Sequence, residues 1–158
     1  MKTVLTNQQL TLAIQRLAHQ ILENHVGLKQ TVLIGLQPRG IHFSDQLVGA
    51  MRTMLPGQTI DYGKLDITFY RDDVRKGLHV ANQTDIPFTV ENKQVILIDD
   101  VLYTGRTVRA ALEGLNNFGR PRAVQLAVIV DRGHRELPIR PDFVGKNIPT
   151  QVSDEVDV

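Results

Sequence analysis

The sequence contains no cysteine at all. This absence excludes a disulfide framework, a thiolate zinc site and a cysteine nucleophile, and it agrees with a reducing compartment. No apolar run approaches the ~20 residues that a membrane-spanning helix needs. The first residues, 1–5, also lack the long apolar region of a secretion signal. We therefore expect a cytoplasmic protein without a membrane partner.

Neither sign of charge dominates, because the formal net charge is +1. The net charge therefore argues neither for nor against a nucleic-acid partner. Between Val101 and Thr150, however, the sequence has eight basic residues and four acidic ones, and seven of the eight basic residues are arginine. The planar fork of arginine suits phosphate oxygens, although ordinary surface salt bridges explain the same composition. A length of 158 residues fits a single domain.

Helical and extended patterns alternate along the chain. Thr6 and Gln9 fit a capping box ahead of a helical pattern that Gly27 ends. Further helical patterns begin near Phe43 and after Thr104, which is a candidate cap for the third helix. Apolar or β-branched segments predict strands at 31–36, 59–70, 94–98 and 123–130. This alternation predicts an α/β domain with a mostly parallel sheet and helices on both faces.

Ligands of such sheets bind beyond the carboxyl ends of the strands. The segments that follow the predicted strands are 37–40, 70 onward, 99–107 and 131–135. The polar stretch 71–92 is a long connection or an irregular hairpin, and a loop of that length in a small domain is often a functional lid. We expect a binding site where these segments meet.

Residues 95–107 carry the most chemical information. A buried strand leads to Asp99 and Asp100, and a small-residue turn at 103–107 then opens a helix. The free amides of that turn and the helix dipole favour a phosphate, and Gly105 permits close backbone approach. The two acids suit the hydroxyls of a sugar, directly or through a metal. An ordinary capped turn is the alternative, but it needs neither two acids nor Thr-Gly-x-Thr. A Walker loop and Gly-x-Gly-x-x-Gly are both absent.

Four apolar residues, two acids and Thr-Gly-x-Thr resemble the motif by which type I phosphoribosyltransferases bind phosphoribosyl pyrophosphate (PRPP). The resemblance to the bifunctional PyrR family is closer still, and it rests on residues 38–40, 66–73, 99–109, 131–140 and 145–150. It runs nearly end to end and is weakest between Val74 and Asn92. It implies the type I phosphoribosyltransferase fold with a small hood, as one domain over residues 1–158. Family members continue through a further short strand beyond the position of Val158.

The resemblance implies that the protein is a uracil phosphoribosyltransferase, which makes UMP and pyrophosphate from uracil and PRPP. Asp99 and Asp100 would hold the ribose hydroxyls, residues 103–107 the 5′-phosphate, and residues 38–40 the pyrophosphate. The implied catalytic residues are Asp100, Arg39 and Arg71. The implied PRPP-binding residues are Pro38, Arg39, Gly40, Asp99, Asp100, Val101, Leu102, Tyr103, Thr104, Gly105, Arg106 and Thr107. Mg²⁺ is implied through chelation by pyrophosphate oxygens, with Asp99 and Asp100 as its only candidate protein contacts.

The family pattern also implies a lid at 70–77, where a disordered charged loop is an equal alternative for Arg75 and Lys76. The implied base-binding residues are Asp131, Arg132, Gly133 and His134. His134 is either a base contact or a surface histidine. Tyr103 stands where some purine enzymes of the superfamily carry an acid. A dedicated general base is therefore missing there, and uracil is expected to bind as an anion.

Family resemblance further implies regulation of pyrimidine genes, with UMP or UTP as effectors and a hairpin in an mRNA leader as the target. The implied RNA-binding residues, on a basic face shared by a homodimer or larger homo-oligomer, are Arg16, His19, Arg135, Arg140 and Lys146. The set lacks interleaved aromatic residues, so contacts to RNA shape and phosphates are expected. Gln15 and Asn24 stand where we expect Thr and Arg in RNA-binding members.

Three alternatives remain open from the sequence. In the first, the protein is a salvage enzyme that has lost its RNA-binding surface. In the second, it is a regulator that binds nucleotide with little turnover. In the third, it is a transferase for another base such as a purine. Retention of Asp99, Asp100, Arg39 and Arg71 argues against the second. Tyr103 and the downstream motifs argue against a purine.

Overall fold

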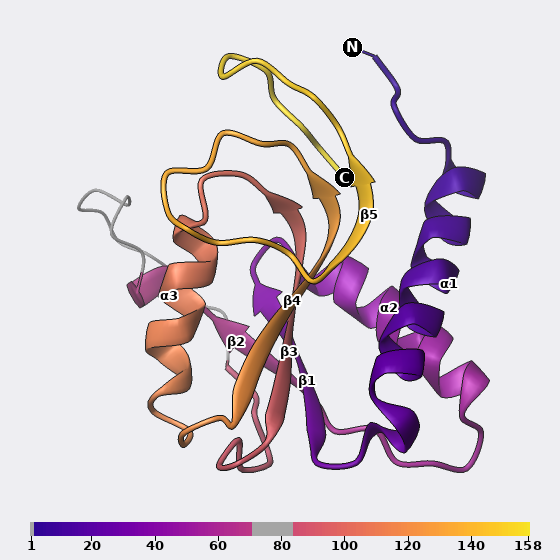
Figure 1. Cartoon of the computed structure of the whole chain (residues 1–158), viewed down its shortest axis with the longest axis vertical. Helices are drawn as coiled ribbons and strands as arrows, with labels where there is room; N and C mark the ends of the chain where they lie inside the picture. Colours follow the sequence, from indigo (N-terminus) through magenta and orange to yellow (C-terminus); the bar gives the residue numbers. More distant parts are fainter. Residues whose placement is uncertain (1, 71–83) are drawn as a thin grey trace.

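The structure is a computed structural model that describes residues 2–70 and 84–158, without the side chain of Phe69. Its described strands form one parallel sheet in the order β2-β1-β3-β4-β5. The strands are β1 (Thr31–Gln37), β2 (Tyr62–Asp66), β3 (Gln94–Leu102), β4 (Ala123–Asp131) and β5 (Phe143–Asn147). All of them therefore present their carboxyl ends at the same edge, which is the upper edge in Figure 1.

Helices cover both faces of this sheet. Helices α1 (Asn7–Asn24) and α2 (Ile41–Met54) lie on one face, and α3 (Arg106–Leu115) lies on the other (Figure 1). Short 3₁₀ turns, η1 (Val26–Leu28) and η2 (Thr68–Tyr70), follow α1 and β2. The loops after β4 and β5 extend beyond the carboxyl edge and form a small hood over it. The predicted α/β layering is confirmed.

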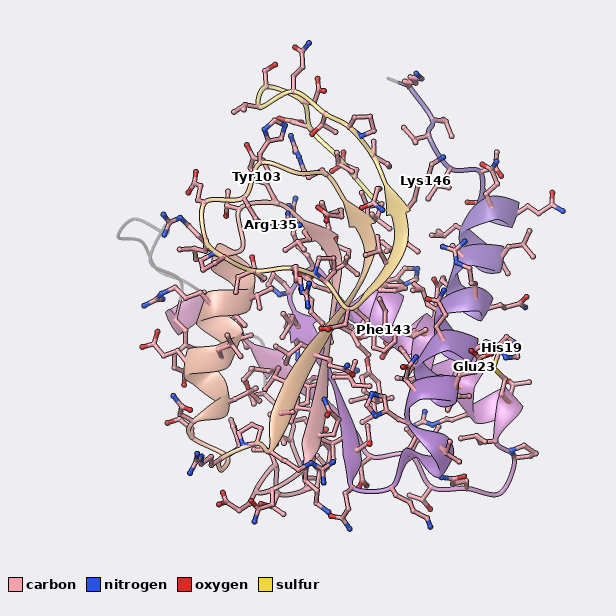
Figure 2. All side chains as sticks on the ribbon, viewed as in Figure 1. His19, Glu23, Tyr103, Arg135, Phe143 and Lys146 are labelled. Atoms are coloured by element: carbon pink, nitrogen blue, oxygen red, sulfur yellow. The ribbon has the colours of Figure 1, made fainter. Side chains whose placement is uncertain are left out.

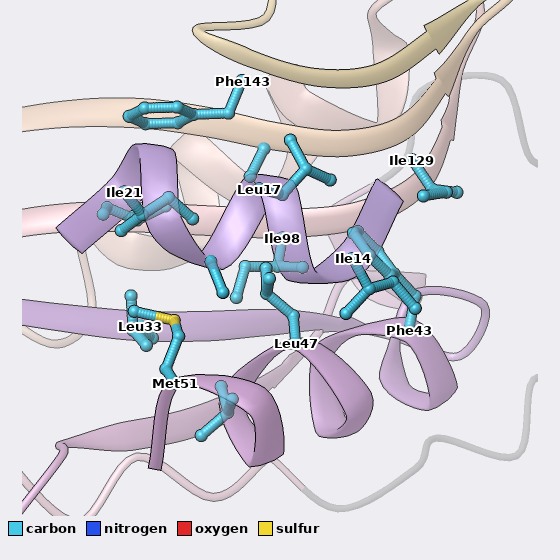
Figure 3. Packing of buried hydrophobic residues seen from close by; sticks show 14 of the residues in the cluster. Ile14, Leu17, Ile21, Leu33, Phe43, Leu47, Met51, Ile98, Ile129 and Phe143 are labelled. Atoms are coloured by element: carbon cyan, nitrogen blue, oxygen red, sulfur yellow. The ribbon is translucent and has the colours of Figure 1, made fainter. Parts of the chain in front are cut away.

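Apolar side chains fill the layer between the sheet and each set of helices. On the α1–α2 side, Leu17 and Ile21 of α1 and Leu47 of α2 are fully buried against Leu33 and Ile98 of the sheet (Figure 3). A separate cluster packs α3 against the opposite face. Each such side chain stabilises the fold by roughly 1.5–3 kcal/mol relative to its exposed state. The sheet is therefore held rigidly beneath the loops at its carboxyl edge.

The start of α1 follows the prediction. Thr6 accepts a hydrogen bond from the amide of Gln9 at 3.1 Å, and the Gln9 side chain accepts one from the amide of Thr6 at 2.9 Å. The helix ends at Asn24, and Gly27 takes a positive φ of 67° in the turn that follows. The capping box is confirmed, whereas the helix ends three residues before Gly27, with His25 as its C-cap.

Three boundaries differ from those expected. Strand β3 continues past residue 98 to Leu102, because it stays paired with β4 as far as Asp131. Residues 59–70 are a strand only at 62–66, because the Asp66 carboxylate accepts hydrogen bonds from the amide and hydroxyl of Thr68 and starts η2. Thr104 is not the N-cap of α3; that position is Gly105, although the Thr104 hydroxyl still accepts from the amide of Arg106 at 3.2 Å.

Strand β5 was not predicted, since Phe143 and Val144 are its only large apolar residues. The stretch 71–92 is described only at its returning end. There the amide of Lys64 donates to the carbonyl of Asp85 at 2.8 Å, and the amide of Asp85 donates back at 2.8 Å. This antiparallel bridge ties the returning end of the stretch to β2. The choice between a long connection and an irregular hairpin depends on residues 71–83, which lie outside the described residues. The expected lid residues Arg71, Arg75 and Lys76 lie outside the described residues. No helix in the described part of the chain is long and apolar enough to cross a membrane.

Candidate active site

The turn after β1 lies directly on β3. A side chain on Gly40 would place its Cβ 2.8 Å from Oδ1 of Asp99 and 2.8 Å from the carbonyl oxygen of Leu36. Only glycine permits this approach, because real Cβ contacts do not become so short. The amide of Gly40 donates to Leu36 at 2.8 Å and closes the turn. The structure thus packs the turn at Gly40 against Asp99.

The two adjacent acids occupy different environments. Asp99 is 6% exposed, and its Oδ1 accepts a hydrogen bond from the amide of Asp100 at 2.9 Å. Burial, and then the charge of Asp100, raise the pKa of Asp99 well above its usual range, while the nearby Arg39 acts in the opposite direction. Asp100 is only half-buried, and its Oδ1 accepts from the amide of Val101 at 2.7 Å. Asp100 is therefore the acid that a ligand can reach, and Asp99 supports the turn at Gly40.

The turn between β3 and α3 has the form of an anion-binding site. Gly105 has a φ of 95°, which is the left-handed region that side chains disfavour, and α3 begins at the next residue. The first-turn amides of a helix have no partner within the helix, and the helix dipole adds positive potential at the same point. Residues 103–107, which we call the cradle, follow β3. They therefore form a site that suits a phosphate.

The segment after β4 packs against the outer side of the cradle. The carbonyl of Thr104 accepts from the amides of Glu136 at 2.9 Å and Leu137 at 3.2 Å. The guanidinium of Arg106 forms an ion pair with Glu136 at 2.8 Å. A Cβ on Gly105 would lie 3.1 Å from Cγ1 of Ile139. Sequence reasoning missed Glu136 and Ile139, because only their contacts with a distant turn give them a role.

Two of the expected base-binding residues, Arg132 and His134, lie against the ring of Tyr103. The guanidinium of Arg132 lies 4.1 Å from the centre of the Tyr103 ring, and the His134 ring meets it edge-on at 6.1 Å. Arg132 is only 7% exposed, and it donates to the carbonyl of Gln151 at 3.0 Å. Nε2 of His134 lies 2.6 Å from the carbonyl of Thr150 and must donate to it, since a carbonyl only accepts. Residues 131–134 therefore adjoin the cradle, and the chain near residue 150 fixes them.

The expected RNA-binding cations do not all lie on one surface. Arg16 of α1 donates to the carbonyls of Gly145 and, at 3.4 Å, Val144. Lys146 of β5 is nearby on the same side of the molecule, and His19 is one helical turn along α1 from Arg16 (Figure 2). Arg135 instead lies beside Tyr103 in the loops at the carboxyl edge (Figure 2). Arg140 is exposed on the segment between β4 and β5.

The described residues contain no group of three or more acidic, histidine or cysteine side chains that would hold a metal ion. Asp100 is nevertheless accessible at the carboxyl edge, so its carboxylate fits an outer contact to an ion whose other ligands come from a substrate. Asp66, which was not singled out as a site residue, is 4% exposed at the end of β2, and its Oδ2 has no partner among the described residues.

Comparison with known proteins decides the family. Residues 1–157 match the phosphoribosyl transferase domain family. The chain is 50% identical over 158 residues to the "Bifunctional protein PyrR" of Deinococcus deserti, covering 99% of this chain and 86% of the relative. It is 49% identical to the protein of that name in Pelotomaculum thermopropionicum, covering 92% and 81% of the two chains. This chain belongs to the PyrR family. The sequence-based recognition is thereby confirmed.

Solved structures of lower identity show the same fold. A hypoxanthine phosphoribosyltransferase from Staphylococcus aureus superposes with a TM-score of 0.74 at 22% identity, covering 95% of this chain and 79% of the other. A hypoxanthine-guanine phosphoribosyltransferase from Bacillus anthracis gives a TM-score of 0.75 at 20% identity, covering 96% and 84%. The expected type I phosphoribosyltransferase fold is confirmed, and the fold is shared with enzymes named for purine bases.

Proposed function

We propose that this PyrR-family protein transfers the phosphoribosyl group of PRPP to uracil and releases pyrophosphate. The observation that carries the proposal is the meeting of three elements at one edge of the sheet. These are the phosphate-type cradle at 103–107, the accessible acid Asp100, and the turn at Gly40 packed on Asp99. A cradle for the 5′-phosphate, an acid for the ribose and a second turn, which carries Arg39 at the start of α2, match the parts of PRPP.

In this reaction the bond between C1′ and pyrophosphate breaks, and a bond between C1′ and N1 of uracil forms. Positive charge develops on the ribose, and negative charge develops on the leaving oxygens. Asp100 would hold the ribose hydroxyls and Arg39 would face the pyrophosphate, so both act where charge develops. Mg²⁺ bound to pyrophosphate oxygens would supply charge neutralisation, with Asp100 as its protein contact.

The base would lie against residues 131–134. Tyr103 carries no carboxylate, so the turn offers no general base beside the uracil ring. Uracil would therefore enter with N1 already deprotonated. Nε2 of His134 is occupied by the Thr150 carbonyl. That contact favours a fixed positioning role for His134 over proton transfer.

The variant Asp100→Ala tests the placement of the ribose. It removes the accessible carboxylate and should lower kcat/KM for PRPP by roughly a hundredfold, the usual effect of deleting one group that stabilises developing charge. Thermal unfolding should change little, because Asp100 is only half-buried. Steady-state kinetics with PRPP and uracil measure the effect. Activity close to that of the unmodified protein would contradict this ribose site.

We also propose that the protein binds a hairpin in pyrimidine mRNA in a UMP-dependent manner. Arg16, His19 and Lys146 lie on the same side, where α1 adjoins β5, and Arg140 is exposed nearby in the sequence. A homodimer or larger homo-oligomer is part of this proposal. Leu12, 58% exposed on the outer side of α1, is an apolar side chain that a second copy would cover. Sedimentation equilibrium measures that assembly.

RNA binding is tested by filter binding to a pyrimidine leader hairpin over a salt series, with and without UMP. Lys146→Ala should weaken binding and lower the slope of log affinity against log salt by about 1, the effect of losing one phosphate contact. Lys29→Ala is the matched control, because Lys29 is exposed at the amino edge of the sheet. Binding that is indifferent to sequence and to UMP would leave a salvage enzyme without this regulatory function.

A further inference from the structure

Arg135 joins three segments of the site through one guanidinium group. Its Nη1 donates to the carbonyl of Tyr103 at 2.9 Å, and its Nε donates to the carbonyl of Ile139 at 2.8 Å. Its Nη2 forms an ion pair with Oδ2 of Asp131 at 2.6 Å. The side chain is only 24% exposed. Three of its five N–H donors are therefore committed inside the protein, to the cradle, the base segment and the loop before β5.

The contact with Tyr103 fixes the direction of a cradle amide. In a planar trans peptide unit, the carbonyl and the following N–H point in opposite directions. Because the Tyr103 carbonyl points to Arg135, the N–H of Thr104 points away from Arg135, and we infer that it faces the inside of the cradle. The Thr104 carbonyl points to the amides of Glu136 and Leu137. By the same geometry, this orientation of the Thr104 carbonyl directs the N–H of Gly105 away from Glu136 and Leu137, toward the inside of the cradle.

Arg135 itself is held in place from the opposite side. Burial acts to raise the pKa of Asp131, but hydrogen bonds from Arg135 and from the amide of Gly133 outweigh it and lower the pKa. The carboxylate is therefore charged at neutral pH and anchors the guanidinium. The contact of Ile139 with Gly105 and the ion pair between Arg106 and Glu136 add support from the same segment. The outer wall of the cradle is thus built from residues 135–139.

We propose that Arg135 is a positioning residue for the 5′-phosphate. It acts on the phosphate through the peptide units that follow Tyr103 and Thr104, to which its guanidinium and the neighbouring residues 136 and 137 are hydrogen-bonded. The inference rests on the proposed phosphoribosyl transfer. It also explains how a basic residue of the 131–140 segment serves catalysis without touching the substrate.

The test compares Arg135→Ala and Arg135→Lys with a matched control, Arg122→Ala, whose arginine is exposed at the amino edge of the sheet. Two probes separate the two ends of the site. Ribose 5-phosphate occupies the cradle, and pyrophosphate occupies the turn at residues 38–40. Binding of each is measured by calorimetry, together with the KM for PRPP and kcat.

Arg135→Ala should weaken ribose 5-phosphate about tenfold, the usual effect of losing a charged hydrogen bond. The KM for PRPP should rise by more than kcat falls, and pyrophosphate should bind unchanged. Arg135→Lys should also fail to restore binding, since a single ammonium cannot match the planar fork on three separate acceptors. Arg122→Ala should bind both probes as the unmodified protein does.

Unchanged binding of ribose 5-phosphate to Arg135→Ala would overturn the inference while leaving the proposed transfer intact. An equal loss of ribose 5-phosphate and pyrophosphate would also overturn it, because general damage to the fold affects both ends of the site. If the unmodified protein bound neither probe, the proposed function would fail, and the positioning role would fail with it.

Discussion

At the scale of single residues, the main finding is the separation of two neighbouring acids. The sequence predicts Asp99 and Asp100 as a pair that holds ribose hydroxyls. Side chains alternate along a strand, and β3 extends through both residues. One acid is consequently buried under the turn at Gly40, and the other stays accessible. Sequence alone could not make this distinction, because it requires the end of β3 and the position of a different turn.

Asp99→Asn should make the protein more stable at neutral pH. The raised pKa of Asp99 means that its contribution to stability is present below about pH 3.9, the usual value, and is lost as the pH rises toward the folded-state pKa. Asparagine does not titrate, and its side-chain oxygen can still accept from the amide of residue 100. The melting temperature should rise by a few degrees, since about 1 kcal/mol shifts a domain of this size by roughly 2–4 °C.

The gain from Asp99→Asn should shrink as the pH falls toward 4, and calorimetry across that range measures it. Asp61→Asn is the control, because Asp61 is exposed. A change in melting temperature that does not depend on pH would contradict a buried, ionising Asp99. Lower activity in the same variant is expected, because Asp99 packs against the turn at Gly40, which would face pyrophosphate under the proposed function.

At the scale of elements, the predicted pattern was right wherever a face is strongly apolar. Helices α1 and α2 and strands β1 and β4 lie where apolar spacing indicates them. Strand β5 was missed, because half of it is polar and its pairing with β4 is visible only in three dimensions. The cradle was predicted from its residue types, whereas the wall behind it, residues 135–139, depends on contacts with no local signal.

Gly105→Ala and Gly57→Ala separate backbone strain from damage to the cradle. Both glycines have positive φ, 95° and 79°, so both variants should lose about 1–2 kcal/mol of stability. A Cβ at residue 57 meets nothing within 4 Å, whereas a Cβ at residue 105 lies 3.1 Å from Ile139. Only Gly105→Ala should displace the cradle and lower kcat/KM for PRPP, by up to roughly a hundredfold for a shift near 1 Å.

Denaturant unfolding and steady-state kinetics of the two variants provide the comparison. Equal losses of stability with unequal losses of activity are expected. If Gly57→Ala impaired turnover as much as Gly105→Ala, the loss of activity in Gly105→Ala would not come from displacement of the cradle.

At the scale of the whole molecule, the layering followed from the alternation of strands and helices, and the family followed from short motifs. The small hood followed from the family resemblance, but the contacts that hold it did not follow from any sequence pattern. The segments near residues 135 and 150 are placed by hydrogen bonds from Arg135, Arg132 and His134 to backbone carbonyls. The choice of base is also not set by the fold, since structures with TM-scores of 0.74 and 0.75 are named for purine substrates. Under the proposed function, that choice would depend on Tyr103 and residues 131–134.

Steady-state turnover with PRPP, Mg²⁺ and a panel of bases tests the central claim most directly. Uracil should be consumed with formation of UMP and pyrophosphate, and hypoxanthine should give no product above background. Turnover of hypoxanthine without turnover of uracil would contradict the assignment of this site to a pyrimidine.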